Sequence, residues 1–221
     1  MSHSSASTVH GRLPLVTLAM AVTSVAVFVA DVPVEAVQWT RSDAWSFTAL
    51  TYAFAHTDGL HLLANLSILG LVGFGLERHV GSPRVAVVAV AGLLSGAAGH
   101  ALVSGFPLAG MSAGVYALVA YHLVYGWHCP FVSQRTGRPV LWPSHLFYLL
   151  LAGEAWLMVA TLVHPLPWGA GAHLAGLAVG IAACGVFDRR WPGAFGSRRA
   201  VGAGAPRPVE PRRSSLVWTC R

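Results

Sequence analysis

The sequence predicts an all-α polytopic membrane protein, built as a bundle of six transmembrane helices. Of the 221 residues, 55% are hydrophobic and 10% are charged, whereas a soluble domain carries roughly 25% charged residues. The mean hydropathy is +0.60. The chain also contains six apolar runs close to the about 17–25 residues that a membrane-spanning helix needs. These observations argue against a water-soluble globular fold.

The six apolar runs follow a polar N-terminal segment, residues 1–12, and precede an Arg-rich tail. They are Leu13–Ala30, Leu60–Leu76, Val85–Val103, Leu108–Trp127, His145–Val163 and Trp168–Phe187. The first run is long for a signal peptide, and no A-x-A-like cleavage site follows it. We therefore expect a cytoplasmic segment over residues 1–12 and one membrane domain over residues 13–190.

The longest connection, Asp31–Gly59, mixes aromatic and charged side chains. It contains Trp39, Trp45 and Phe47 among Glu35, Arg41 and Asp43. Amphipathic aromatic rings settle at the membrane–water interface. We therefore expect this loop to lie at the level of the lipid headgroups.

The positive charges predict the orientation of the spans. All 14 basic residues are Arg. One side of the membrane, made of the N-terminal segment, Glu77–Arg84, His128–Ser144 and the tail, collects 13 of them, and the other side has only Arg41. Because loops rich in Arg remain in the cytoplasm, we expect both termini there.

The tail, residues 191–221, is rich in Pro, Gly and Arg, cannot bury a core and is expected to be disordered. From Asp188 onward there are 8 Arg and 2 acids, so we expect the tail to lie on anionic inner-leaflet lipid and not to bind nucleic acid. Cys129, Cys184 and Cys220 have unrelated spacings, which indicate neither a disulfide framework nor a zinc site. No metal or organic cofactor is expected.

Polar residues inside the spans mark candidate functional positions, because polar groups are costly in hydrocarbon. They are His61, Asn65, His100, Ser112, Tyr116, His122, Glu154 and His173. In the predicted orientation Ser112, His173 and the His61/Asn65 pair lie in the first turns of spans that begin outside. Three spans far apart in sequence therefore bring these residues to one depth, in the outer third of the bilayer.

Small residues surround the serine and the histidine. Gly110-Met111-Ser112-Ala113-Gly114 is a glycine-flanked serine like that of many acyl-transfer enzymes, although such spacings are also ordinary packing surfaces in membranes. Gly176 and Gly180 follow His173 at small-xxx-small spacing and allow its span to pack closely. A serine near a helix start would also direct free backbone N–H groups toward an oxyanion.

These residues together resemble the rhomboid family of intramembrane serine proteases. The segment from His56 through His61 to Asn65 resembles the family's H-x4-H-x3-N element, and Glu77-Arg78 its Glu-Arg pair. Gly110-Met111-Ser112 matches the G-x-S element, and Gly171-Ala172-His173-Leu174-Ala175-Gly176 matches the G-A-H-x-x-G element. The match covers most of residues 39–188. It implies a six-helix rhomboid fold in the cell membrane and hydrolysis of peptide bonds in or near transmembrane helices of membrane-protein substrates.

The resemblance also implies residue roles. Ser112 would be the nucleophile and His173 the general base and later the general acid, working at the extracytoplasmic side. The Ser112 backbone N–H, His61 and Asn65 would hold the oxyanion. Tyr116 would stack on His173, with Gly110 and Gly176 in supporting positions. We expect a lateral entrance at the fifth span, with the bulky gating side chains Phe147, Trp156 and Met158.

Two positions depart from the family pattern. The family commonly has G-x-S-G, and this chain has Ala113 after the serine. The family's first loop commonly carries a Trp-Arg pair, and this chain has Phe47 and Thr48 at those positions. The extra methyl group of Ala113 either crowds the site or is tolerated.

Two other functions stay open. A non-catalytic rhomboid-like protein would bind transmembrane helices without cutting them. A haem protein needs paired axial histidines; His61 and His173 lie at one depth, but His100 and His122 offer no second pair. We expect His100 and His122 to make interhelical hydrogen bonds.

The remaining acids and zinc chemistry receive no catalytic role. Glu77-Arg78 is expected to be a structural pair at a helix end, and Glu154 has no assigned role. The chain has no H-E-x-x-H zinc motif. Glu154 also lacks a second in-span carboxylate for an aspartyl pair.

Overall fold

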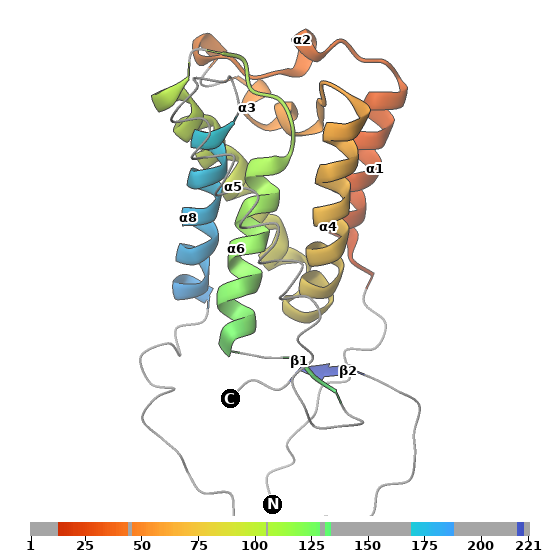
Figure 1. The fold of residues 1–221 in the computed structure, drawn as a ribbon, viewed down its shortest axis with the longest axis vertical. Coiled ribbons are helices and arrows are strands. Elements are labelled where there is room, and N and C mark those ends of the chain that lie inside the picture. Colours follow the sequence, from red (N-terminus) through yellow and green to blue (C-terminus); the bar gives the residue numbers. More distant parts are fainter. Residues whose placement is uncertain are drawn as a thin grey trace, which may run out of the picture.

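The computed structural model describes residues 13–43, 46–104, 106–128, 131–133, 169–187 and 216–218. In this part of the chain the fold is helical, with long helices side by side and short helices across one end (Figure 1). The predicted fifth span, with Glu154, Phe147, Trp156 and Met158, lies outside the described residues.

The long helices coincide with the other five predicted spans. They are α1 (Leu15–Val29), α4 (Gly59–Val80), α5 (Ser82–Val103), α6 (Ser112–His128) and α8 (Ala170–Phe187). By length and composition α4, α5 and α8 can cross a membrane, and α1 and residues Ser112–Tyr125 of α6 are shorter apolar helices. Helices suit a bilayer because they satisfy every backbone N–H and C=O group internally.

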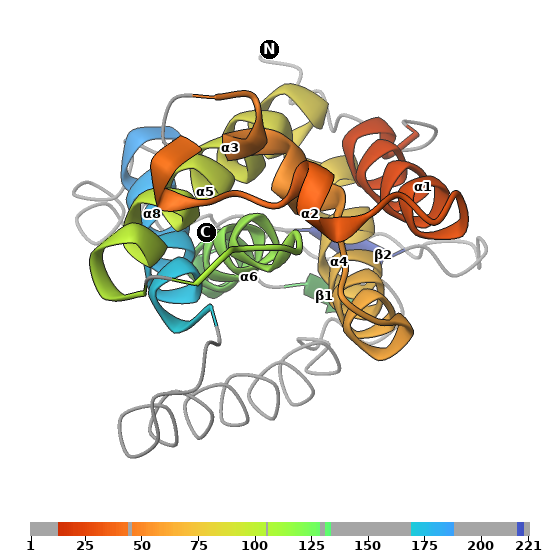
Figure 2. The ribbon, with the colours of Figure 1, turned by 90° about the horizontal axis from the view of Figure 1, so that it is seen from above.

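Helix α6 lies at the centre of the described bundle. Seen from above, α4, α5 and α8 pack around it, and α1 packs against α4 (Figure 2). Buried residues face several sides of α6, among them Ala113, Val115, Leu118 and Tyr121. A helix that is apolar on all sides is usually enclosed by its neighbours. Helix α6, which begins at Ser112, is enclosed in this way by α4, α5 and α8.

The connection between α1 and α4 covers the end of the bundle at which α4, α6 and α8 begin. It contains α2 (Val34–Val37), η1 (Arg41–Asp43), α3 (Thr48–Thr51) and η2 (Tyr52–Phe54) (Figures 1 and 2). Trp39 and Leu108 form an isolated antiparallel bridge, with N–H···O distances of 2.9 and 2.8 Å. The connection is thereby tied to the segment that leads into α6.

Trp39 is not among the lipid-facing rings of this loop, and the position of the loop at the headgroups stays a prediction. The Trp39 side chain is 2% exposed and belongs to the hydrophobic core, because the bridge to Leu108 draws this part of the loop inward. Phe47 is 71% exposed, as an interfacial side chain would be. Trp45 lies outside the described residues.

Two helix boundaries differ from the predicted spans. Residues 108–111 were expected to be helical, but Leu108 is in the bridge and Gly110 has a φ of 103°, which a right-handed helix excludes. The predicted loop Glu77–Arg84 is much shorter than expected, because α4 continues to Val80 and α5 begins at Ser82. Gly81, with a φ of 90°, makes the turn as glycine does at many helix ends.

A short antiparallel pair lies at the other end of the bundle (Figure 1). It joins β1 (Phe131–Ser133) and β2 (Leu216–Trp218). The pair is small beside the helices, so the fold class is all-α as predicted, and the disorder expected of the tail stays a prediction. A β-branched valine and a tryptophan, both frequent in strands, interrupt the polar sequence at β2. The Arg distribution predicts that both strands lie on the same side of the membrane, as their pairing requires.

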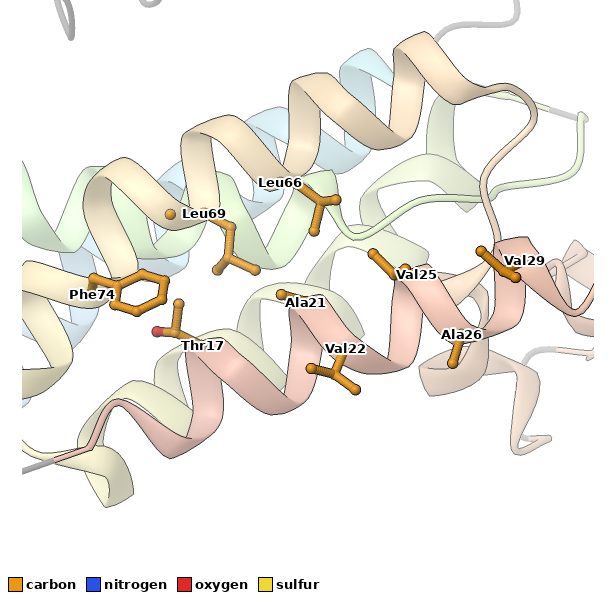
Figure 3. Close-up of a pocket in the computed structure, with 10 residues that line it drawn as sticks. Thr17, Ala21, Val22, Val25, Ala26, Val29, Leu66, Leu69 and Phe74 are labelled. Atoms are coloured by element: carbon orange, nitrogen blue, oxygen red, sulfur yellow. The ribbon is translucent and has the colours of Figure 1, made fainter.

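An apolar groove of about 540 Å³ runs between α1 and α4 (Figure 3). Its lining includes Ala21, Val25, Leu66, Leu69 and Phe74. Thr17 is the one polar lining residue, and its hydroxyl already bonds Glu77. None of the predicted site residues lines this groove, so we place the chemistry elsewhere.

Candidate active site

Ser112 and His173 lie at the starts of two neighbouring helices. Ser112 is the first residue of α6, and His173 is in the first turn of α8, where its backbone N–H donates to the Gly169 carbonyl (2.9 Å). His173 Nε2 lies 2.8 Å from Ser112 Oγ. Both side chains are half-buried. With the hydroxyl donating to Nε2, the imidazole can take a proton from a serine nucleophile. We call this end of the bundle the site end.

The Tyr116 ring lies flat against the imidazole of His173. The ring centroids are 4.3 Å apart and the planes differ by 8°. Tyr116 stands four residues after Ser112, on the same face of α6. Its hydroxyl is buried and has no hydrogen-bond partner among the described residues, so the contact with His173 depends on the aromatic face.

Helices α6 and α8 approach closely because glycines face alanines. A Cβ atom at Gly176 would meet the backbone of Ala113, and one at Gly180 would meet the Ala117 carbonyl. The predicted small-xxx-small surface of α8 is therefore the one that packs on α6. This close approach brings His173 within hydrogen-bond distance of Ser112.

The methyl group of Ala113, which departs from the family pattern, is accommodated by a glycine on α5. Ala113 is fully buried. A Cβ atom at Gly96 would collide with the Ala113 Cβ and would come within 3.1 Å of the Tyr52 hydroxyl. The methyl group thus occupies the space that Gly96 leaves open, on the side of α6 that packs against α5.

His61 and Asn65 lie beside the glycine that precedes the serine by two residues. A Cβ atom at Gly110 would stand 2.7 Å from His61 Cε1 and 3.8 Å from Asn65 Nδ2. Asn65 Nδ2 donates to the His61 carbonyl (3.1 Å), which leaves the second amide hydrogen available. Gly110 itself is held by its N–H, which donates to the Tyr52 carbonyl (2.8 Å).

The loop before α4 orients His61. Asp58 caps α4, and its carboxylate accepts the His61 backbone N–H (2.8 Å). This hydrogen bond, together with one from the Thr57 hydroxyl, holds the pKa of the exposed Asp58 carboxyl below its usual value. Thr57 Oγ1 also lies 3.3 Å from His61 Nδ1. Because the Thr57 hydrogen is donated to Asp58, Oγ1 accepts from Nδ1–H of His61, and Nε2 is the nitrogen nearer Gly110. Rotation of the Thr57 hydroxyl toward Nδ1 would place the ring proton on Nε2 instead.

We assign no chemistry to three other polar residues, His100, His122 and Glu77. His100 Nε2 donates to the Phe106 carbonyl (2.8 Å), so its partner is the following loop and the predicted interhelical bond is wrong for this residue. His122 is half-buried in α6, away from its first turn. Glu77 is buried and accepts hydrogen bonds from the start of α1, a role that spacing along the sequence does not reveal.

Within the described ranges, no group of three or more His, Cys, Asp or Glu side chains is arranged to hold a metal ion. The nitrogen of His173 that a haem iron would need is engaged with Ser112. The residues brought together are therefore suited to nucleophilic chemistry by a serine assisted by a histidine.

The fold and the site define a class: helical membrane proteins with a serine–histidine pair near one end of the bundle. The profile of the Rhomboid domain matches residues 41–190 of this chain. The chain belongs to the rhomboid family and is an integral membrane protein.

Two similar proteins illustrate the relationship. Rhomboid-related protein 3 of Homo sapiens is 36% identical over 151 residues, which cover 64% of this chain and 36% of that protein. Rhomboid protease GlpG of Klebsiella pneumoniae is 33% identical over 141 residues, covering 63% of this chain and 47% of that protein. The matched region thus spans between a third and a half of the length of these curated relatives.

Proposed function

We propose that this protein is an intramembrane serine protease that hydrolyses peptide bonds in or near transmembrane helices of membrane proteins. The observation that carries the proposal is the 2.8 Å hydrogen bond between Ser112 Oγ and His173 Nε2. Family membership and similarity to proteins named rhomboid protease support it. We further propose that the protein lies in the cell membrane with the site end on the extracytoplasmic side.

The first half of the proposed reaction acylates the serine. His173 Nε2 accepts the Ser112 proton as Oγ attacks the substrate carbonyl carbon. The oxyanion that forms is held by the Ser112 backbone N–H, one of the free donors at the start of α6, and by the second hydrogen of Asn65 Nδ2. His61 Nε2 joins them as a donor once the Thr57 hydroxyl turns from Asp58 to Nδ1 and the ring proton is on Nε2. Protonated His173 then donates to the leaving amine nitrogen as the peptide bond breaks.

The second half releases the product. Water attacks the acyl-enzyme, and His173 accepts a water proton and returns one to Ser112 Oγ. Half-burial of both side chains leaves the pair reachable from the site end. A substrate helix must unwind before its carbonyl can enter, because a helical backbone is hydrogen-bonded to itself. We therefore expect substrates with helix-breaking or small residues near the cut.

The proposal is tested with the purified full chain, reconstituted in lipid vesicles with a fluorescent transmembrane peptide substrate. Cleavage is expected for the wild type and is expected to fall at least a thousandfold in Ser112→Ala and His173→Ala. Ser67→Ala is the matched control, because this exposed serine donates to the Leu63 carbonyl of its own helix (2.8 Å) and to no other described residue. Thermal unfolding in detergent verifies that all variants are folded.

Two results would contradict the proposal. Cleavage that persists in Ser112→Ala would exclude the serine as nucleophile. A wild-type protein that binds transmembrane peptides but cuts none of them would favour the non-catalytic rhomboid-like alternative. A haem absorption band in the purified protein would support the remaining alternative.

A further inference from the structure

A second pocket, distinct from the Ser112/His173 pair, opens at the site end. It has a volume of about 530 Å³ and lies between the end of α1, α2 and the loop before α4. Its polar lining residues are Asp31, Glu35, His56, Thr57 and Asp58. The rest of the lining is aliphatic or aromatic and includes Val27 and Phe28. The pocket therefore combines an apolar wall with three carboxylates, all of them exposed at its mouth.

His56 is a buried lining residue of this pocket, and one of its nitrogens lacks a partner. The side chain is 5% exposed, and no group in the described part of the chain forms a hydrogen bond with Nε2. Nδ1 lies 3.3 Å from the Phe54 carbonyl, so Nδ1 carries the proton and donates. Burial, assisted by neighbouring His61, lowers the pKa of His56 to about 4. The ring is neutral at pH 7, and Nε2 is an unsatisfied acceptor.

The polar groups of the pocket can thus accept more hydrogen bonds than they can donate. The Thr57 hydroxyl donates its hydrogen to Asp58 (3.0 Å), and carboxylates only accept when ionised. Within the described residues, no side-chain hydrogen bond or ion pair engages Asp31 or Glu35. Such a lining matches a cation that carries several N–H donors, and the apolar wall matches the aliphatic stem of an Arg or Lys side chain.

We propose that this pocket binds a basic side chain of the substrate, in the segment that flanks the cut bond at the site end. The proposal rests on the function proposed above. A compact metal ion fits the pocket less well, because no three acidic or histidine side chains converge among the described residues.

The position of the pocket relative to Ser112 limits where the basic residue falls. The His56 and His61 rings are in edge contact, with centroids 5.0 Å apart, and His61 in turn lies against Gly110, two residues before the serine. The path from the pocket through His61 and Gly110 to Ser112 is on the order of 15–20 Å long, because successive Cα atoms are about 3.8 Å apart. An extended substrate advances about 3.3 Å per residue, so the basic residue falls within about five residues of the cut bond.

The test uses fluorescent transmembrane peptides that differ at one position beside the cut bond. This position carries Arg, Gln or Glu, and in separate peptides it lies between one and eight residues from the cut. For the reconstituted full chain, kcat/KM for Arg is expected to exceed that for Gln about three- to tenfold at low salt, mainly through KM. Glu is expected to be the poorest. The preference is expected to peak within the first five positions.

The Asp31→Asn/Glu35→Gln double variant is expected to bring the Arg-to-Gln ratio close to one. Asn tolerates the positive φ of 51° at residue 31. Arg41→Gln is the control, because it changes an exposed charge in the same connection but outside the pocket lining, and it is expected to keep the ratio. Equal ratios in the wild type and the double variant would overturn the proposal.

Binding of the same peptides to Ser112→Ala separates this proposal from the proposed function. Tighter binding of the Arg peptide, lost in the triple variant with Asp31→Asn/Glu35→Gln, supports the pocket even if the wild type cuts nothing. Cleavage without any charge preference overturns the pocket and leaves the protease function standing. Thermal stabilisation by CaCl2 that the double variant lacks would assign the pocket to a divalent cation and overturn the proposal.

Discussion

Tyr116 contacts His173 through its aromatic ring and not through its hydroxyl. The rings stack at 4.3 Å, whereas nothing in the part of the chain that the structure describes hydrogen-bonds the Tyr116 hydroxyl. We therefore expect Tyr116→Phe to retain cleavage within about twofold. Tyr116→Ala is expected to lose about two- to tenfold in kcat/KM, since aromatic pairs contribute about 0.5–1.5 kcal/mol. Kinetics on the reconstituted protein measure both, and equal losses would assign the role to the hydroxyl.

His56 makes the stability of the protein depend on pH. Its pKa is lowered to about 4 in the fold, mainly by burial, and the unfolded chain titrates near 6.5. Between these values the unfolded state binds more protons, so stability is fully present above about pH 6.5 and decreases as the pH falls toward 4. Thermal unfolding in detergent at pH 7 and pH 5 is expected to show this decrease.

His56→Gln isolates the contribution of this residue to the pH dependence. Its melting temperature is expected to fall less between pH 7 and pH 5 than that of the wild type, because Gln does not titrate. Parallel decreases in the two proteins would show that other groups carry the effect.

At the scale of helices, α5 and α6 share the space for one methyl group. Gly96→Ala is expected to destabilise the protein by about 1–3 kcal/mol, as overpacking does, because the new Cβ would collide with the Ala113 Cβ. Adding Ala113→Gly relocates the methyl group from α6 to α5. The double variant is expected to be more stable than Gly96→Ala alone in detergent unfolding. Additive destabilisation would contradict the shared space.

Glu77 fastens α4 to the beginning of α1. Its carboxylate accepts hydrogen bonds from the backbone N–H groups of Val16 and Thr17 (2.8 Å each) and from the Thr17 hydroxyl (2.7 Å). These backbone groups are free donors at the helix start, where a negative charge is favourable. Glu77→Gln is expected to lower the free energy of unfolding by about 1–3 kcal/mol. Arg78→Gln, at the exposed neighbouring position, is the control and is expected to change little.

The sequence predicts helices better than the contacts between them. The lengths of the apolar runs locate α1, α4, α5, α6 and α8, because each segment must by itself be long and apolar enough to cross the bilayer. It fails at residues 108–111, where pairing with Trp39 decides the backbone. It likewise misses the Glu77 cap and the Gly96–Ala113 contact, because both join residues far apart in the chain. The sequence predicts that Ser112 and His173 lie close together, from their shared depth in the bilayer and from the family pattern. It does not predict the 2.8 Å distance between them, which depends on how α6 packs against α8.

For the whole molecule, the distribution of Arg predicts that the site end faces outward. The test uses single cysteines in a background that lacks Cys129, Cys184 and Cys220. Phe47→Cys is expected to react with a membrane-impermeant maleimide on intact cells, because Phe47 is 71% exposed in the connection that covers the site end. Arg78→Cys, near the other end of α4, is expected to react only after permeabilisation. The reverse pattern would invert the orientation.

If the proposed mechanism holds, the separation of Ser112 and His173 along the chain also determines when the protein becomes active during synthesis. The two residues are 61 positions apart, and translation proceeds at about 5–20 residues per second. A growing chain therefore carries the serine for several seconds before its histidine has been made. During that time the unfinished protein cannot cut neighbouring membrane proteins. A product truncated before α8 would be inactive because it lacks His173. On the proposed mechanism, the enzyme becomes active only when α8, which carries His173, has been synthesised and packed against α6.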